Sequence, residues 1–269
     1  MSAGGAGAAA ALERLMADPS TTGVFTDFDG TLSPIVEDPD TANPLDGATD
    51  ALGAVARRFA RVGVISGRPA RFLRRHVGVE GVSLWGLHGL ETVEGDEVVV
   101  MAGVEPWRAV VAAAAAAART DLAGVAGVED KTYALTLHFR RSPAAEQEVA
   151  RWAERQAAAT GLAVHGARMS YELRPPVPHG KDVILEGAAR DLVTACFIGD
   201  DLGDAVAFDA LDRLAAGDGL AAVRIAVASE EAPAELLSRA DLVVDGPAGV
   251  VDLLWQLAGA GPGARPDAA

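Results

Sequence analysis

The chain has 269 residues, half of them hydrophobic and only 5% aromatic, which is enough for one large domain or for a core with a smaller second unit. Its formal net charge of −15 argues against nucleic acid and against anionic membranes as partners. A phosphorylated substrate would be repelled at long range, so its binding site would need a local cluster of Lys and Arg.

The sequence also carries signals about its compartment. Cys196 is the one cysteine, so no disulfide can form within the chain, which suits a reducing environment. No apolar stretch approaches the roughly 20 residues that span a bilayer. The start, "MSAGGAGAAAALERLM", lacks the basic and Leu-rich segments of a signal peptide and predicts a flexible start running into a helix. We therefore expect a cytoplasmic protein.

Apolar strand-like runs alternate with helical patterns in the first hundred residues. This rhythm predicts a parallel sheet covered by helices on both faces. The expected elements are a strand at 23–28, a helix at 45–60, a strand at 61–66, a helix at 69–77 and a strand at 81–87.

The rhythm changes in the middle of the chain and then resumes. A hairpin is expected at 91–100. The following segments predict an α+β insert with an open-faced sheet at roughly 102–170, from helices at 106–123 and 142–159, a strand at 131–140 and a strand pair at 161–166 and 168–175. From Gly180 onward the pattern again alternates: a helix at 181–192, a strand at 194–200, a helix at 204–215, a strand at 221–227, the segment 235–246 and a helix ending near Leu257. We predict an α/β core from 1–101 and 171–258, a cap from 102–170 and a disordered tail from 259–269.

Two aspartates, Asp27 and Asp29, follow directly on the first strand in "VFTDFDGTL". Ligands of open parallel sheets bind at the carboxyl ends of the strands, where these charges would lie. A calcium loop is one reading, but Leu32 stands where that loop needs Gly and Asp38 where it needs Glu. An ordinary Asp-Gly turn and an aspartate nucleophile supported by magnesium remain as alternatives.

A second acidic motif, "FIGDDLGD", also follows an apolar strand. It supplies Asp200, Asp201 and Asp204 at the carboxyl end of that strand. Carboxylates from two strand ends of one sheet could converge on a hard cation, and Mg²⁺ favours few carboxylates together with water and phosphate oxygens.

Two further motifs could bind phosphate. "VISGRP" places Ser66, Gly67 and Arg68 before a helix, where a hydroxyl and backbone amides can bind an anion, although Ser66 could equally cap that helix. "PHGKD" places Lys181 just inside a helix, and it is not a P-loop, because Asp182 stands where Ser or Thr is required. A lone Lys there is usually a solvated charge, but here it could bridge a phosphate and a carboxylate.

These four elements, in this order, resemble the haloacid dehalogenase (HAD) superfamily of phosphatases. "GLHGLE", "VEDKTYALTLHFR" and "YELRPPVPHGKD" look more narrowly like the trehalose-6-phosphate phosphatase family, over roughly residues 20 to 258. The resemblance implies a Rossmannoid parallel-sheet core with an inserted α+β cap of the C2B type, a Mg²⁺ cofactor and hydrolysis of trehalose 6-phosphate through an aspartyl-phosphate.

The resemblance also implies roles for individual residues. Asp27 would be the nucleophile, and Asp29 would protonate the leaving sugar and then activate water. Asp27, the backbone carbonyl of Asp29, and Asp200 would hold the metal. Ser66 and Lys181 would bind the phosphoryl oxygens. Asp204 would orient Lys181 or a metal-bound water, and Asp201 would support this arrangement.

For the substrate, the resemblance implies that Glu129, Lys131 and Glu172 grip the sugar hydroxyls. The weaker substrate-binding candidates are Gly67, Arg68, His88, Arg140 and Arg174. On pattern alone His138 is structural. A trehalose-6-phosphate synthase would act in the same pathway.

One departure and two rival functions remain. The family often reads Thr-Asp-Glu after "GDDx", whereas this chain has Gly203, Asp204 and Ala205, which leaves the outer metal shell open. The core motifs do not separate trehalose 6-phosphate from sucrose 6-phosphate or a glycosyl phosphoglycerate. A non-catalytic partner subunit is the rival from a different class, although such chains usually lose the first Asp or the Lys.

Overall fold

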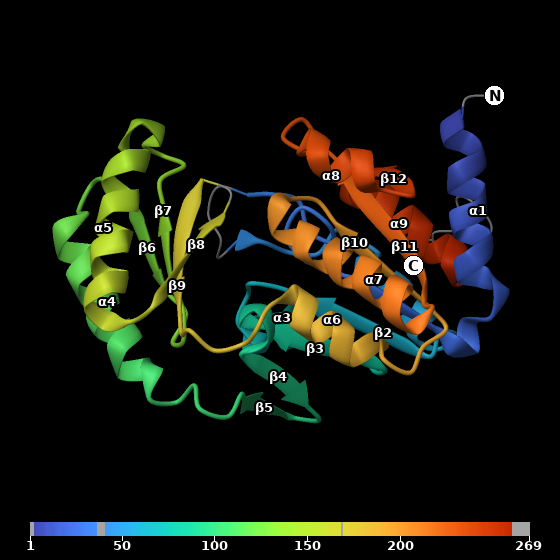
Figure 1. Ribbon diagram of the computed structural model, residues 1–269, viewed down its shortest axis with the longest axis horizontal. Helices are drawn as coiled ribbons and strands as arrows, with labels where there is room; N and C mark the ends of the chain where they lie inside the picture. The colour runs from blue at the N-terminus through green and yellow to red at the C-terminus, as the bar shows by residue number, and fades with distance from the viewer. Residues whose placement is uncertain (1–2, 37–40, 168, 260–269) are drawn as a thin grey trace. The chain divides into compact units, whose positions relative to one another are not determined.

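The computed structural model describes residues 3–36, 41–167 and 169–259 (Figure 1). Its contacts divide the chain into two compact units, residues 1–89 with 179–269 and residues 90–178. These divisions lie at 89/90 and 178/179, whereas sequence patterning places them at 101/102 and 170/171. The hairpin at 91–100 and residues 171–178 are thereby assigned to the second unit. Apart from Gly259, the predicted disordered tail lies outside the described residues.

The first unit is built on a parallel sheet, as the alternating rhythm predicts. Its strands are hydrogen-bonded in the order β12-β11-β10-β1-β2-β3. Every residue of β1 is buried, as expected for a central strand of a parallel sheet. The strands are β1 (Thr22–Thr26), β2 (Arg61–Ile65), β3 (Val82–Gly86), β10 (Thr194–Gly199), β11 (Ala221–Ala228) and β12 (Leu242–Asp245).

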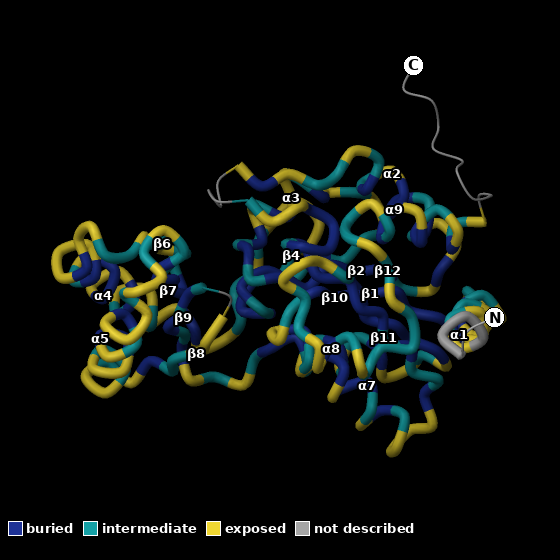
Figure 2. The backbone as a smooth tube through the Cα atoms, turned by 90° about the horizontal axis from the view of Figure 1, so that it is seen from above, coloured by how far each residue is buried: buried dark blue, intermediate teal, exposed yellow. Residues whose placement is uncertain are grey.

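Helices cover both faces of this sheet. Figure 2 shows α2, α3 and α9 on one side of the strands and α7 and α8 on the other. In the described residues no helix is long and apolar enough to cross a bilayer. The helices are α1 (Ala3–Ala17), α2 (Ala48–Ala56), α3 (Ala70–Val77), α6 (Lys181–Ala189), α7 (Ala205–Asp218), α8 (Ala234–Arg239) and α9 (Gly246–Leu257), with 3₁₀ turns η1 (Pro19–Thr21), η3 (Leu87–Gly89) and η5 (Leu202–Asp204).

Large apolar side chains fill the space between α6, α7, α8 and the sheet. Phe25, Phe197 and Phe208 are fully buried in this cluster. Cys196, on the same strand as Phe197, is also fully buried, and burial raises the pKa of its thiol to about 12. A thiol held in its neutral form is unreactive, so Cys196 serves packing, as its apolar sequence context indicates.

The order of the strands fixes where a ligand can bind. β1 is flanked by β10 and β2, and the chain winds away from β1 in opposite directions on its two sides. Such a switch point leaves an opening at the carboxyl ends of the two central strands, here β1 and β10. The first aspartate motif follows β1 and the second follows β10.

The second unit is α+β, as expected for the insert. It contains a hairpin of β4 (Glu91–Glu94) and β5 (Glu97–Val100) and an antiparallel sheet in the order β6-β7-β9-β8. α4 and α5 pack on this sheet with Leu135, Leu137 and Leu173 in a shared apolar cluster. The remaining elements are α4 (Trp107–Asp121), β6 (Gly127–Asp130), β7 (Leu135–His138), η4 (Pro143–Ala145), α5 (Glu146–Thr160), β8 (Ala163–Ala167) and β9 (Ser170–Arg174).

The strand predicted at 131–140 is present as β7 but begins only at Leu135, and the pattern missed β6. The segment from Gly127 to His138 forms two antiparallel strands, β6 and β7, joined by a turn. Thr132 has φ of 74°, and its amide donates a hydrogen bond to Asp130 Oδ1 at 3.0 Å. An Asp side chain that binds the backbone two residues later makes a turn that alternation alone does not reveal.

Candidate active site

The acidic motifs meet at the carboxyl ends of β1 and β10. Thr26 pairs with Ile198, and the amide of Asp27 donates to the carbonyl of Ile198 at 2.9 Å. Carboxylate oxygens of Asp27, Asp200 and Asp204 all lie within 4.8 Å of one another. These three carboxylates together with Lys181 are called the acidic centre below.

Lys181, from the first turn of α6, lies among these carboxylates. Its Nζ is 3.0 Å from Asp27 Oδ1 and donates to Asp204 Oδ1 at 2.6 Å. The residue is 4% exposed, so it is not a solvated surface charge. Burial works to lower the pKa of Lys181, but the charges of Asp204 and Asp27 outweigh it and raise that pKa above its usual value. Lys181 is therefore a permanent cation.

The pKa values of two of these carboxylates, Asp27 and Asp204, are raised by burial. Burial raises the pKa of Asp27 well above its ordinary value; Lys181 opposes the shift, whereas Asp204 and Asp200 add to it. Burial likewise raises the pKa of Asp204 against the pull of Lys181. One lysine does not balance three buried carboxylates, so the acidic centre favours an additional cation or a proton.

The acidic centre fits a hard divalent cation. Mg²⁺ is commonly held by one or two carboxylates and keeps open positions for water and phosphate oxygens. Asp27 and Asp200 come from adjacent strand ends and can supply those oxygens. The backbone at Gly30, with φ of 79°, passes so close to Asp200 that an added Cβ would lie 2.1 Å from Asp200 Oδ2. The turn therefore requires glycine, and it keeps the Asp200 carboxylate in place.

Asp204 and Asp201 support the motif rather than simply adding charge. Asp204 Oδ2 accepts hydrogen bonds from the amides of Asp200 at 2.9 Å and Asp201 at 3.2 Å. Asp201 in turn caps η5, accepting from the amide of Asp204. An added Cβ on Gly203 would lie 2.9 Å from Asp201 Oδ1, so the small residue leaves room for this reciprocal cap. The departure at Gly203 and Ala205 thus falls on a turn and on the first residue of α7.

Asp29 lies apart from these carboxylates and is paired with Arg68. Arg68 Nε donates to Asp29 Oδ2 at 2.7 Å and its NH2 to Oδ1 at 2.6 Å, which is a bidentate ion pair. The Asp29 side chain is 33% exposed. Arg68 also stacks over the Phe72 ring of α3, with its guanidinium carbon 4.8 Å from the ring centroid. Arg68, expected as a substrate ligand, therefore orients Asp29 in this structure.

The segment Ser66–Arg68 forms a buried turn. Ser66 is 1% exposed, and its hydroxyl accepts from the amide of Arg68 at 3.2 Å. It does not cap α3, whose N-cap residue is Pro69. An added Cβ on Gly67 would lie 2.7 Å from His88 Nε2, so the imidazole packs directly on the glycine.

A strained turn after β3 places His88 there. Leu87 and His88 have φ of 47° and 55°, in the left-handed region that such residues rarely adopt. The amide of Leu87 donates to the carbonyl of Arg68 at 2.9 Å, and that of His88 to the carbonyl of Ser66 at 2.8 Å. Strain of this kind clusters at functional sites, and no sequence motif signalled it.

The second unit carries its own cluster of charges on one face of the antiparallel sheet. Strand register aligns Glu129, Thr136 and Glu172 in one row, whereas the alternate residues pack under α4 and α5. This cluster, called the polar face below, consists of Glu129, Lys131, Thr136, His138, Glu172 and Arg174.

Glu172 is the centre of the polar face. It is 3% exposed, and its Oε1 accepts from Lys131 Nζ at 3.0 Å and from Thr136 Oγ1 at 3.1 Å. Its Oε2 accepts from Arg174 Nε at 2.5 Å and also contacts the Arg174 NH2 group. Four donors fill the acceptor capacity of one carboxylate, so Glu172 fixes the positions of Lys131 and Arg174.

Glu129 and His138 form the more open end of the polar face. His138 Nε2 lies 2.8 Å from Glu129 Oε2, and Lys131 Nζ is 3.8 Å from the same oxygen. Side-chain exposure is 26% for Glu129 and 33% for His138. The pattern assigned His138 a structural role, but its two-residue spacing from Thr136 places it on this face. Arg140 lies in the turn after β7.

Comparison with known sequences identifies the family. The sequence model described as trehalose-phosphatase matches residues 25–241. The chain belongs to the trehalose-phosphatase family. Its match includes both aspartate motifs, Lys181 and the whole second unit.

Curated relatives of the family agree over a shorter range. The trehalose-phosphate phosphatases of Mycolicibacterium paratuberculosis and Mycobacterium avium are each 37% identical over 204 residues, which is 70% of this chain and 51% of theirs. An uncharacterized glycosyl hydrolase of Mycobacterium tuberculosis is 39% identical over 203 residues, or 15% of its length. The chain thus spans about half the length of the curated phosphatases that it matches.

Solved structures agree with the fold. The C-terminal domain of Candida albicans trehalose-6-phosphate phosphatase is 22% identical, with a TM-score of 0.75 over 94% of this chain and 97% of that one. A phosphatase of the HAD superfamily from Bacteroides thetaiotaomicron is 17% identical, with a TM-score of 0.56 over 88% and 94%. The predicted HAD-like Rossmannoid core with an inserted cap is confirmed.

Proposed function

We propose that the protein is a Mg²⁺-dependent phosphatase that hydrolyses trehalose 6-phosphate to trehalose and phosphate through an aspartyl-phosphate. The observation that carries this proposal is the acidic centre: a buried carboxylate at a strand end, 3.0 Å from a buried lysine and beside two further carboxylates. In this proposal the first unit is the catalytic core and the second unit is the cap that reads the sugar.

In the first step, Asp27 attacks phosphorus and the bond from phosphorus to the sugar oxygen breaks. The electron pair stays on that oxygen, which takes a proton from Asp29. Lys181 and the buried Ser66 turn bind the phosphoryl oxygens, and Asp204 keeps Lys181 oriented. Since Arg68 holds Asp29 in this structure, proton transfer requires Asp29 to exchange this pair for the substrate.

In the second step, water attacks the phosphorus of the aspartyl-phosphate. Asp29 accepts the proton of that water, the bond from Asp27 to phosphorus breaks, and phosphate leaves. When bound by Asp27, Asp200 and the Asp29 carbonyl, Mg²⁺ supplies positive charge that stabilises the phosphoryl oxygens. Most of the acceleration in such transfers comes from positioning and charge compensation, which this arrangement of residues provides.

The polar face supports a sugar as the leaving group. The side chains of Glu129 and His138 are partly exposed, and Glu172 holds Lys131 and Arg174 in position to donate. Sugar hydroxyls both donate and accept, so a face with paired acids and bases suits them. Gly67, His88 and Arg140 remain proposed contacts of the same substrate, and a trehalose-6-phosphate synthase is the proposed pathway partner. A cytoplasmic location is consistent with the single buried thiol.

Phosphate release measured side by side with Mg²⁺ tests the proposal. The substrates are trehalose 6-phosphate, sucrose 6-phosphate, glucose 6-phosphate and glucosyl phosphoglycerate. We expect the highest kcat/KM for trehalose 6-phosphate. A preference for one of the others would transfer the proposal to another capped sugar phosphatase, and no release from any would favour a non-catalytic partner subunit.

A further inference from the structure

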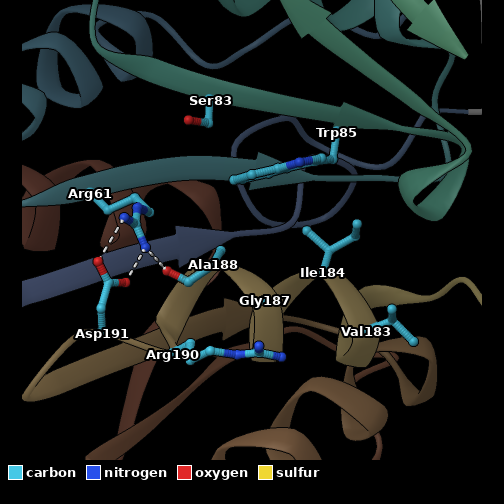
Figure 3. A pocket seen from close by; sticks show the side chains of 9 residues that line it. All are labelled: Arg61, Ser83, Trp85, Val183, Ile184, Gly187, Ala188, Arg190 and Asp191. Atoms are coloured by element: carbon cyan, nitrogen blue, oxygen red, sulfur yellow. Dashed lines mark hydrogen bonds and ion pairs between the residues drawn. The ribbon is translucent and has the colours of Figure 1, made fainter. Parts of the chain in front are cut away.

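A cavity of about 500 Å³ lies on the first unit, between β3 and one flank of α6 (Figure 3). It is a different place from the acidic centre, whose residues do not line it. One wall is formed by Ser83 and Trp85, which are two apart on β3 and so share a face of the sheet. The other wall is formed by residues of α6 at helical spacing, among them Ile184, Gly187 and Ala188.

Trp85 is the largest side chain that lines this cavity. It lies against Gly63 of β2, where an added Cβ would be 2.4 Å from the ring, and it packs at a tilt on Phe25 with centroids 6.4 Å apart. One side of the ring is thus fixed on the sheet, while Trp85 as a whole is only half-buried. A rigid aromatic surface with a free side suits a flat ring.

The glycine in the opposite wall keeps the cavity open. Gly187 lies inside α6, where glycine costs about 1 kcal/mol relative to alanine. Nothing lies within 4 Å of a Cβ added at this position, so packing does not require the glycine. Because glycine has no side chain at this position, the approach to Trp85 is open.

The polar groups around the cavity are mostly donors. Arg61 NH1 donates to Asp191 Oδ1 at 2.9 Å and contacts the carbonyl of Ala188, so this pair closes one end of the cavity. Across the described ranges, the Ser83 hydroxyl, the Trp85 indole N–H and the Arg190 guanidinium make no hydrogen bond or ion pair. Three hydrogen-bond donors without an acceptor, one of them cationic, favour a negatively charged ligand with several hydrogen-bond acceptors.

We propose that this cavity is a binding site for a small organic anion that carries a ring. The ring lies on Trp85 opposite Gly187, and the anionic group meets Arg190. The volume is within the range of about 300–1,000 Å³ typical of small-molecule sites, and an apolar lining with a few polar groups is their usual composition. The anion is either an aromatic carboxylate or an anionic ester of a sugar. Both offer a ring for Trp85 and a negative charge for Arg190.

Fluorine NMR of the protein labelled with 5-fluorotryptophan tests this site. The chain has four tryptophans, and the Trp85→Phe variant identifies the Trp85 resonance. The probes are 2-naphthoate and glucose 6-sulfate, with 2-naphthamide and glucose as their uncharged counterparts. We expect a saturable shift of the Trp85 resonance with at least one anion below about 10 mM, and the responding anion identifies the class of ligand.

Two glycine variants provide the matched comparison. Gly187→Leu fills the cavity and should weaken the response at least about tenfold without loss of fold, since leucine is the better helix former. Gly217→Leu, at another open glycine in α7, should leave the response unchanged. Arg190→Ala should weaken the binding of the anions and leave the binding of their uncharged counterparts unchanged. No saturable shift of Trp85, an unchanged response in Gly187→Leu, or equal binding of the uncharged probes would overturn the proposal.

Discussion

The acidic centre of the first unit and the polar face of the second use charge in opposite ways. The acidic centre buries three carboxylates with one lysine, so its negative charge exceeds its positive charge. The polar face sets two glutamates against Lys131 and Arg174, and it satisfies them internally. The first therefore favours an additional cation or a proton, whereas the second is balanced by its own pairs and would exchange them for a ligand. The same types of side chain, carboxylates and cations, are thus left unbalanced at the proposed site of chemistry and paired at the proposed site of recognition.

The largest test removes the nucleophile from the acidic centre. Asp27→Asn should lower kcat by about 10³-fold or more, because an amide does not attack phosphorus. The fold should persist, since the change relieves crowding among buried carboxylates. Phosphate release and the melting temperature measure the two effects, with Asp218→Asn, an exposed position on α7, as control. Turnover above about a tenth of the parent would rule out Asp27 as nucleophile.

The excess of negative charge in the acidic centre can be tested without substrate. In chelator, Asp200→Asn should be as stable as the parent or more so, because one buried charge has gone. Mg²⁺ at about 100 times its Kd should stabilise the parent by about 2.7 kcal/mol and the variant by far less. Chemical denaturation with and without Mg²⁺ gives both numbers. Equal stabilisation of parent and variant would remove Asp200 from the metal site.

The polar face should respond in a different way. Glu172→Gln should lower kcat/KM for trehalose 6-phosphate by about 10²-fold, because Lys131 and Arg174 lose their common anchor. Hydrolysis of p-nitrophenyl phosphate, which has no sugar, should change by less than about threefold. Glu154→Gln on the exposed side of α5 is the matched control, and the melting temperature verifies the fold. Equal losses on both substrates would show that the polar face does not recognise the sugar.

A structural ion pair away from both regions gives the smallest effect. Although burial acts to raise it, the pKa of Asp241 lies below its usual value because Arg224 donates to its carboxylate at 3.0 and 3.1 Å. A lowered folded pKa contributes stability that is full above the unfolded pKa of about 3.9 and is lost as pH falls through the folded value. Asp241→Asn should therefore cost about 1 kcal/mol at pH 7 and progressively less under acid. A cost that does not change between pH 7 and pH 3 would contradict this assignment.

The sequence predicted what depends on periodicity and on order along the chain. Buried strands ending in aspartate, and a lysine at a helix start, were sufficient to predict the acidic centre, because parallel strands bring their carboxyl ends together. The α+β insert followed from a change of rhythm. These features are local patterns whose meaning does not depend on distant contacts.

What the sequence did not predict depends on register and on turn conformation. The pairing of Arg68 with Asp29 links residues 39 apart and was hidden from any local pattern. His138 joined the polar face only once β7 was aligned with β6, and the turn that separates these strands rests on the positive φ of Thr132. The left-handed pair Leu87 and His88 likewise has no clear sequence signature, since leucine rarely adopts that conformation.

The buried state of Cys196 has a practical consequence for measuring motion. Because its thiol is fully buried and its pKa is raised to about 12, maleimide dyes should leave it untouched under native conditions. Cysteines introduced at exposed sites such as Asp218 in the first unit and Glu154 in the second could then be labelled without background. A dye pair at those sites would report the distance between the two units in single molecules as substrate arrives and product leaves.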